Sequence, residues 1–353
     1  MMTVSLKSVA LMGALALAGF SLVPSRGTTS AASVAPNPSA YQRWRLPSAP
    51  PAPRDNIPNA DRVALGKMLF FDPRLSGTRS MACASCHNPM LGWSDGLGTA
   101  RGQFGQTLPR SSPSIVNAAY NALLMWDGRK NTLEEQALAP LDSAVEMNAD
   151  LEQVLRWFKR SPDYQQAFAR AYPNEPIGRD TLGKAIASFE RTVVSRNSPF
   201  DRWLAGEPGA LTPQQLRGFA LFMDRGRANC VACHAAPNFT DGGFHNVGLA
   251  SGAHREADAG RYRIKPIAAM RGAFKTPALR DVEYTAPYFH DGSAATLQAV
   301  IEHYNAGGRS RANLAPEIKP LGLTRVEQAD LVAFLLALSS PPRPFHLPQL
   351  PRE

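Results

Sequence analysis

Two Cys-x-x-Cys-His strings constrain this chain more than any other feature. They run from Cys83 to His87 and from Cys230 to His234, and together they use all four cysteines. In such a string two thiols form thioethers to a haem, and the adjacent imidazole binds its iron. A zinc site would need four ligands in one place, whereas these strings lie far apart in the chain. A redox disulfide would not require a histidine after both pairs. The strings predict two covalent haem c groups, attached through Cys83, Cys86, Cys230 and Cys233, with His87 and His234 on the irons.

The first 35 residues read as an export signal. Lys7 provides the positive start, an apolar run extends from Val9 to Val23, and small residues follow it. The run is shorter than the roughly 20 residues that span a bilayer. We therefore expect a cleavable signal peptide over residues 1–35, no stable membrane span after cleavage, and a location in the periplasm, where haem thioethers form.

The charge balance is less specific. The formal net charge is +9 at pH 7 over 353 residues. This excess favours an acidic redox partner. A solvated surface, together with arginines that neutralise haem propionates, explains it equally well. No lysine-rich tract or aromatic–basic stripe indicates nucleic-acid binding.

A repeat precedes the two haem strings. Residues 66–72 and 218–224 both read Gly-x-x-Leu-Phe-x-Asp on a helical period. We interpret each copy as an amphipathic helix that is followed by a short loop and a haem attachment site. The duplication predicts a mainly α-helical protein of two cytochrome c-like domains, each with one covalent haem.

Capping signals and loop-forming stretches divide the chain. Thr212 precedes a proline, and Thr324 forms a capping box with Glu327, so both are expected to begin helices. A similar box at Thr132 begins a helix that Pro140 is expected to end. Residues 196–209 mark the best domain boundary. The expected organisation is an extended Pro-rich tether at 36–57, an N-terminal haem domain at 58–205, a C-terminal haem domain at 206–342 and a tail at 343–353.

The positions of the histidines indicate which iron is open. Of the seven histidines only His87 precedes residue 230, so the first domain has no second imidazole for its iron. Methionines there more often fill a core than bind iron; those available are Met81, Met90, Met125 and Met147. We therefore expect a free or water-filled position on the first iron. After His234, Met270 is the one methionine that could ligate the second iron.

The chain resembles the bacterial dihaem cytochrome c peroxidase superfamily, and within it the MauG-like branch, over residues 58–340. The resemblance rests on the two haem strings in order and on short runs at residues 69–75, 126–129, 146–147, 277–280 and 285–290. It implies an oxidoreductase of the cytochrome-c peroxidase type with two haem c groups and a calcium ion between its domains.

The resemblance gives the two haems different roles. His87 corresponds to the proximal ligand of the peroxide-reactive haem, and His234 to that of the second haem. Gln136 and Glu146 stand at the places of the distal pair, where a carboxylate moves the proton of bound peroxide and an amide orients the substrate. Trp126 corresponds to an aromatic residue between the haems, a place that also suits core packing.

Two departures from the peroxidase pattern indicate the branch. Reductively activated members carry a distal histidine in the loop after the first haem string, where this chain reads Gly102-Gln103-Phe104. No ligand then has to leave before peroxide binds. At the second haem those members use methionine, and the corresponding residue here is Tyr304, as in MauG-like enzymes. A phenolate ligand donates charge and stabilises high oxidation states of iron.

Other positions match the family less well. Members bind calcium through an asparagine side chain and the carbonyls of a Thr-Ala-Pro loop. Thr285 and Pro287 fit those carbonyls, but Ser111 replaces the asparagine and is a poorer oxygen donor. MauG itself carries a tryptophan two positions before its second haem string, where this chain has Ala228.

We therefore expect a periplasmic dihaem peroxidase that reduces hydrogen peroxide to water. Its electrons come from a small redox protein (a cytochrome c or a cupredoxin) or from an oxidisable protein substrate. Glu146, Gln136 and Trp126 are the expected catalytic residues. One alternative is oxidation of tryptophans on a partner protein, against which Ala228 argues mildly. A second is non-enzymatic electron transfer, which the shortage of histidines disfavours. An iron-linked sensor has no positive sign in the sequence.

Overall fold

The computed structural model describes residues 36–250, 258–342 and 344–352. They belong to a compact unit that begins at Pro36. The expected signal peptide at 1–35 therefore lies outside the described residues. Among the described helices, none combines the length and the apolar character that crossing a membrane requires.

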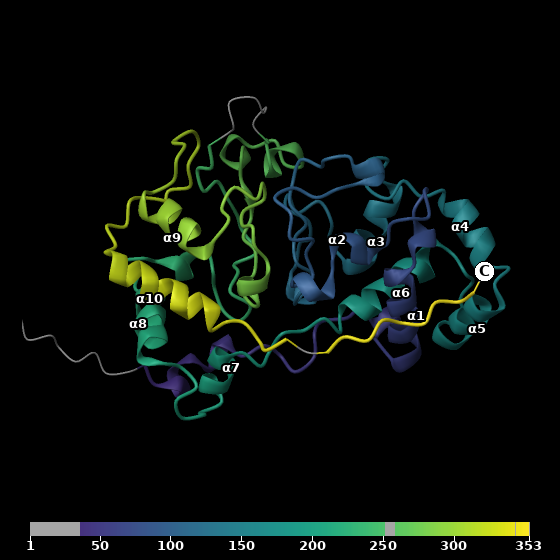
Figure 1. The fold of residues 1–353 in the computed structure, drawn as a ribbon, viewed down its shortest axis with the longest axis horizontal. Helices are drawn as coiled ribbons and strands as arrows, with labels where there is room; N and C mark the ends of the chain where they lie inside the picture. The colour runs from purple at the N-terminus through teal and green to yellow at the C-terminus, as the bar shows by residue number, and fades with distance from the viewer. Residues whose placement is uncertain (1–35, 251–257, 343, 353) are drawn as a thin grey trace, which may run out of the picture. The chain divides into compact units, whose positions relative to one another are not determined.

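The described chain is mainly helical, as expected, and its strands form a short antiparallel ladder (Figure 1). The α-helices are α1 (Ala60–Phe71), α2 (Cys83–Cys86), α3 (Leu133–Asp142), α4 (Leu151–Phe158), α5 (Pro162–Ala171), α6 (Arg179–Glu190), α7 (Pro199–Leu204), α8 (Pro213–Met223), α9 (Leu297–Asn305) and α10 (Arg325–Leu336). The strands are β1 (Phe244–His245) and β2 (Phe274–Lys275). Short 3-10 helices are η1 (Pro38–Trp44), η2 (Arg54–Asn56), η3 (Pro73–Leu75), η4 (Pro89–Leu91), η5 (Gln103–Gly105), η6 (Ala118–Tyr120), η7 (Cys230–Ala232), η8 (Arg261–Arg263), η9 (Ala268–Met270) and η10 (Val282–Tyr284).

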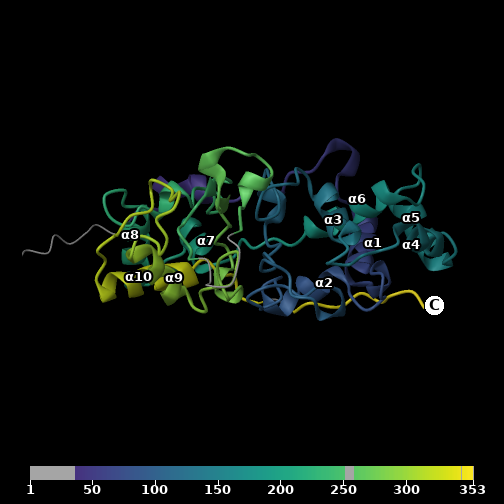
Figure 2. The ribbon, with the colours of Figure 1, turned by 90° about the horizontal axis from the view of Figure 1, so that it is seen from above.

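Two hydrophobic cores organise these elements. The first gathers α1 and α3–α6, and the second gathers α7–α10. The same two groups of helices occupy separate halves of the ribbon in both views (Figures 1 and 2). Helix α7, which lies inside the loop-forming stretch 196–209, packs in the second core through Phe200. Each half thus brings its own buried helices to one haem string.

The repeated sequence gives the two halves the same helix crossing. In α1, a Cβ added to Gly66 would lie 1.9 Å from the carbonyl oxygen of Ala185 in α6. In α8, a Cβ added to Gly218 would lie 1.9 Å from the carbonyl oxygen of Asp330 in α10. Only a residue without a side chain permits such an approach. The repeat is therefore a close helix crossing placed just before each haem string.

The predicted helix starts at Thr212 and Thr324 are confirmed, since each hydroxyl accepts a backbone N–H three residues on. Thr132 also caps α3, but α3 continues through Pro140 to Asp142. The prediction that Pro140 ends the helix is therefore wrong. Proline removes one hydrogen bond to the preceding turn, and this loss costs little where the helix closes two residues later.

Residues 36–57 differ from the expected extended tether. Asn37 caps η1, and Trp44 at the end of η1 is fully buried, with its ring centroid 4.5 Å from that of Phe239. Asn56 is fully buried as well, and its side-chain oxygen accepts the Tyr172 hydroxyl (3.0 Å). A proline-rich composition favours an extended backbone, but it does not indicate which residues the Trp44 and Asn56 side chains pack against.

The C-terminal tail returns from the second core to the first. In Figure 1 the yellow tail leaves α10 and runs to the end of the molecule that holds α4 and α5. Phe345 stacks on Phe71 of α1 (5.3 Å between centroids, 28° between planes) and meets Trp93 edge-on (5.3 Å). Farther on, Arg74 donates to the carbonyl oxygen of Pro351 (2.9 Å). The tail is therefore a strap across the first core.

Replacing Phe345 with alanine tests this strap. We expect the free energy of unfolding to fall by about 1–2 kcal/mol, less than the roughly 3–5 kcal/mol of a fully buried phenylalanine, because Phe345 is partly exposed. Urea denaturation of the haem-loaded protein measures the loss. The control is Leu347→Ala on the same tail, since Leu347 is 71% exposed. Equal effects of the two substitutions would contradict the strap.

Candidate haem sites and distal pocket

A cavity of about 1370 Å³ takes in both haem strings. Its volume exceeds the roughly 300–1,000 Å³ of a site for one small ligand. The lining includes both cysteines of each string, and all four are free thiols: Cys83, Cys86, Cys230 and Cys233. In both strings the thiols lie three residues apart on a single helical turn, in α2 and at η7. The cavity therefore fits two large apolar groups, each attached through two thiols.

The two histidines of the strings are held in the same way. Nδ1 of His87 lies 3.2 Å from the carbonyl oxygen of Trp93, and Nδ1 of His234 lies 2.9 Å from that of Phe239. Trp93 and Phe239 both have left-handed backbones, with φ of 60° and 56°. An imidazole that donates from Nδ1 keeps the Nε2 lone pair for a metal. Burial also lowers the pKa of both histidines, which favours this neutral form.

The predicted distal pair lies in the wall of the cavity. Gln136 of α3 and Glu146, in the loop after α3, both line it. Burial raises the pKa of Cys86 to about 11, and the negative charges of Asp95 and Glu146 add to the shift. Glu146 therefore lies close enough to the first haem string to influence the Cys86 thiol, and its role as a distal carboxylate stays a prediction.

Gln103 holds the loop that carries Glu146. Its backbone N–H donates to the carbonyl oxygen of Glu146 (3.1 Å), and its side-chain amide donates to that of Met147. Gln103 is buried. Gly102 lets the two loops touch, because a Cβ there would lie 1.8 Å from the carbonyl oxygen of Val145. Gln103 thus fixes the loop of Glu146 and Met147 through two backbone carbonyl oxygens.

Trp126 connects segments of the two halves. Its indole N–H donates to the carbonyl oxygen of Ser111 (2.9 Å), and its own carbonyl accepts the backbone N–H of Lys275 in β2 (2.8 Å). The indole also lines the cavity, and its ring lies 6.3 Å from the His290 ring. A half-buried indole in the wall of this cavity suits packing, and its place between two haems stays a prediction.

At the second string the two candidate ligands, Tyr304 and Met270, differ in position, and ligation by Tyr304 stays a prediction. Tyr304 of α9 lines the cavity, whereas Met270, in η9, is absent from the described lining residues. Burial raises the pKa of Tyr304, and the charges of Cys233 and Cys230 raise it further, so the phenol lies near both thiols. Of the methionines considered for the first iron, Met90 is 76% exposed, whereas Met81, Met125 and Met147 line the cavity and Met147 also packs in the first core.

The residues proposed for calcium already have protein partners. The Ser111 hydroxyl donates to the carbonyl oxygen of Phe289 (3.0 Å), and the Thr285 hydroxyl donates to that of Val282 (3.1 Å). Thr285 and Pro287 line the cavity. A cation at this place would compete with the Ser111 hydrogen bond. Calcium binding through Ser111, Thr285 and Pro287 stays a prediction.

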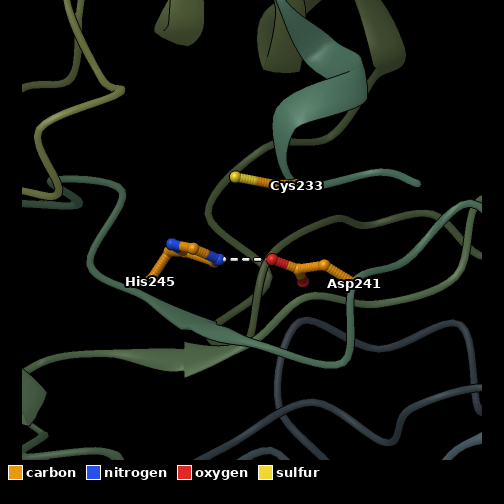
Figure 3. A group of neighbouring side chains, drawn as sticks. All are labelled: Cys233, Asp241 and His245. Carbon is orange, nitrogen blue, oxygen red and sulfur yellow. Dashed lines mark hydrogen bonds and ion pairs between the residues drawn. The ribbon is translucent and has the colours of Figure 1, made fainter.

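Cys233, Asp241 and His245 form a cluster beside the second string, drawn in Figure 3. Nε2 of His245 lies 2.8 Å from Oδ2 of Asp241. This contact raises the pKa of His245 to about 10 and lowers that of Asp241 to about 2. The three groups have metal-ligand character. Because Cys233 belongs to the thioether pair of the second string, we interpret the cluster as a charged pair beside that haem.

The cavity wall also contains two charged residues, Glu190 and Lys275, that the sequence motifs do not indicate. Glu190, at the end of α6, is 3% exposed and leaves Oε2 without a hydrogen-bond partner among the described residues. Burial raises its pKa to about 8, against the opposing charge of Arg191. Burial lowers the pKa of Lys275 to about 8, and a cation there suits a haem propionate. Lys275 stands among mostly apolar residues, which was the available signal, whereas Glu190 is followed by Arg191 and gives no such signal.

Glu190 predicts a specific pH dependence of stability. Its pKa is raised from 4.5 to about 8 in the folded protein. The contribution of protonated Glu190 to the free energy of unfolding is therefore complete below about pH 4.5, and it is lost as the pH rises to about 8. Glutamine stays neutral, so Glu190→Gln should gain up to about 1.4 kcal/mol per pH unit over wild type across this window. Urea denaturation at pH 5, 6, 7 and 8 measures it, with Glu152→Gln as the exposed control. Parallel wild-type and Glu190→Gln profiles would disprove the assignment.

Known proteins share both the sequence and the fold. A family model described as di-haem cytochrome c peroxidase matches residues 60–209. The chain is 46% identical over 313 residues to the methylamine utilization protein MauG of Methylorubrum extorquens, covering 88% of this chain and 87% of that protein. It is 40% identical to a cytochrome-c peroxidase of Denitromonas iodatirespirans, covering 82% and 84%. A crystal structure of a MauG-like protein associated with microbial copper homeostasis matches with a TM-score of 0.78 and 35% identity, covering 84% of this chain and 95% of that one.

Proposed function

Since the chain belongs to the di-haem cytochrome c peroxidase family, we propose that it is an exported, periplasmic peroxidase that takes electrons from a small redox protein. The balanced reaction is H2O2 + 2 H⁺ + 2 e⁻ → 2 H2O, with each electron supplied by one reduced carrier. Cys83, Cys86 and His87 would hold the haem whose iron would supply the chemistry for cleaving the O–O bond of peroxide.

One observation carries this proposal. The cavity wall near the first string presents Glu146 and Gln136, while His87 is the only histidine before residue 230. The first site therefore offers a proton acceptor and an amide donor, and the chain before residue 230 supplies no histidine other than His87. An electron-transfer cytochrome has no need of such a pair.

The chain's own residues then have defined tasks. The Glu146 carboxylate accepts the proton of the near peroxide oxygen and returns it to the departing oxygen. The Gln136 amide orients the peroxide. Gln103 fixes the Glu146 loop through the two backbone carbonyls that it binds. Trp126 offers a path between the halves, and His234 and Tyr304 would hold the iron of the second haem.

Tryptophan oxidation on a partner protein is the second candidate. It is favoured by the 46% identity to a MauG protein. Against it stands Ala228, which is 7% exposed and lines the cavity two residues before the second string, where it offers no aromatic ring.

Steady-state assays separate these functions. Supply peroxide with reduced cytochrome c, reduced cupredoxin or hydroquinone, and measure peroxide consumption and donor oxidation together. The peroxidase proposal predicts two carrier electrons per peroxide. Donor oxidation that stops once the haem irons are reduced, with no peroxide consumed, would favour a plain electron-transfer cytochrome. Slow turnover with every donor, together with oxidised tryptophan in an added partner protein by mass spectrometry, would favour the second candidate.

A further inference from the structure

Residues 261–271 form an outer wall of the cavity. Positions 263–269 are all exposed. Ile264 also lines the cavity, as do the flanking Arg263 and Arg271, whereas Lys265 and Ile267 are not among its lining residues. The segment thus has an inner side toward the haem sites and an outer side toward solvent. We call the outer side the basic–apolar face; it consists of Lys265, Ile267, Ala268 and Ala269.

This region is mainly basic, and Asp258 at its edge pairs with Arg110 (2.7 Å) and lies 3.9 Å from Arg263. Positions 259–279 contain no acidic residue and five basic ones: Arg261, Arg263, Lys265, Arg271 and Lys275. Within this basic region Ile267 is 46% exposed and Ile264 is 45% exposed. Basic charge attracts an acidic partner to the surface. A small apolar centre then adds hydrophobic contact area, but too little for a permanent complex. This is the chemistry of a brief encounter with a small acidic protein.

The segment is held firmly on the fold. Arg261 donates from Nη1 to the carbonyl oxygens of Asp127 and Gly128, each at 2.8 Å. The Asn313 side chain donates to the carbonyl oxygen of Ala268 (3.0 Å). A fixed surface lowers the entropic cost of docking. In Figure 1 this green segment lies at the top of the view, on the side of the second half away from α10.

The same segment leads directly to the proposed electron path. It continues into β2, whose Lys275 donates its backbone N–H to the carbonyl oxygen of Trp126 (2.8 Å). β2 pairs with β1, which carries His245, and His245 contacts Asp241 beside Cys233 of the second string. A protein docked on the outer side is therefore separated from the haem cavity by this one segment.

We infer that the basic–apolar face is the docking surface for the electron donor, and that the donor is a small one-electron carrier with an acidic face. This inference rests on the proposed peroxidase function. Two reduced carriers dock in turn, each loses one electron, and the two electrons with two protons convert one peroxide to two waters. No bond forms between the proteins.

Stopped-flow kinetics of the haem-loaded protein test the surface. The probe is a reduced, strongly acidic cupredoxin, mixed with peroxide-treated protein at rising salt; a basic cytochrome c is the mismatched probe. The test variant is Lys265→Glu with Ile267→Ser. The matched control is Arg325→Glu with Val326→Ser, an exposed basic–apolar pair at the start of α10, where Val326 is 67% exposed. Hydroquinone, which needs no docking surface, is the third donor.

We expect the test variant to oxidise the acidic cupredoxin at least about tenfold more slowly than wild type at low salt, and to lose most of the salt dependence. The control should change less than twofold, and all three proteins should oxidise hydroquinone equally. The docking surface would be disproved if the test and control variants oxidised the acidic cupredoxin at equal rates, or if wild type oxidised the basic cytochrome c faster than the acidic cupredoxin. In either case, hydroquinone turnover would still support the peroxidase function. Failure of hydroquinone turnover in wild type would instead overturn the proposed function. Self-association of wild type in sedimentation, lost in the test variant, would assign the face to a second copy of the chain.

Discussion

The variant Glu146→Gln should react with hydrogen peroxide about 10²–10⁴-fold more slowly than wild type. Glutamine has nearly the shape of glutamate but cannot take up the proton of bound peroxide. The fold of the loop should survive, because Gln103 binds the backbone carbonyl of residue 146 and not its side chain. Stopped-flow absorbance of the ferric protein mixed with peroxide measures the rate.

Two further variants keep this prediction sharp. Glu146→Asp retains a carboxylate at a changed distance and should lose less activity than Glu146→Gln. Glu152→Gln replaces a glutamate whose side chain is 88% exposed and should react like wild type. A Glu146→Gln protein as fast as wild type, or faster than Glu146→Asp, would remove Glu146 from the proton transfer.

The variant Tyr304→Met should raise the reduction potential of the second haem. A phenolate stabilises oxidised iron and a thioether stabilises reduced iron. We expect a shift of about 0.1 V or more, within the roughly 0.8 V over which axial ligands set haem potentials. Redox titration followed by optical spectroscopy measures the potential of each haem separately.

Tyr288→Phe is the matched control for Tyr304. Tyr288 also lines the cavity, but its hydroxyl donates to the carbonyl oxygen of Val282 (3.1 Å). Its loss should leave both potentials unchanged, while Tyr304→Phe should alter the optical and EPR signals of the second haem alone. If Tyr304→Phe and Tyr288→Phe behave alike, Tyr304 is a packed aromatic residue and not a ligand.

The local features of this fold, such as its repeated helices and helix caps, are predicted well from the sequence. The Gly-x-x-Leu-Phe-x-Asp repeat predicts two equivalent helices. Gly66 and Gly218 make equivalent helix crossings, with α6 and α10 respectively. The caps at Thr212 and Thr324 depend on neighbouring residues alone and lie where they were expected. The haem strings and the candidates Glu146, Gln136, Trp126 and Tyr304 all line one cavity.

Long-range packing contacts could not be predicted from the sequence, for physical reasons. Trp44 lies in a proline-rich stretch, and its burial against Phe239 depends on residues almost 200 positions away. Phe345 packs on the first core although it follows the last helix of the second. Gln103 acts through backbone carbonyls, which leave no pattern in side-chain spacing. Such contacts depend on the tertiary structure and cannot be read from periodicity.

The most direct test of the unequal haems is the EPR spectrum of the resting ferric protein before and after one equivalent of hydrogen peroxide, with no reductant present. Our account predicts one high-spin ferric signal from the site at His87 and one low-spin signal from the site at His234 and Tyr304. It predicts that peroxide removes the high-spin signal without prior reduction. Two low-spin signals that peroxide leaves unchanged would contradict it.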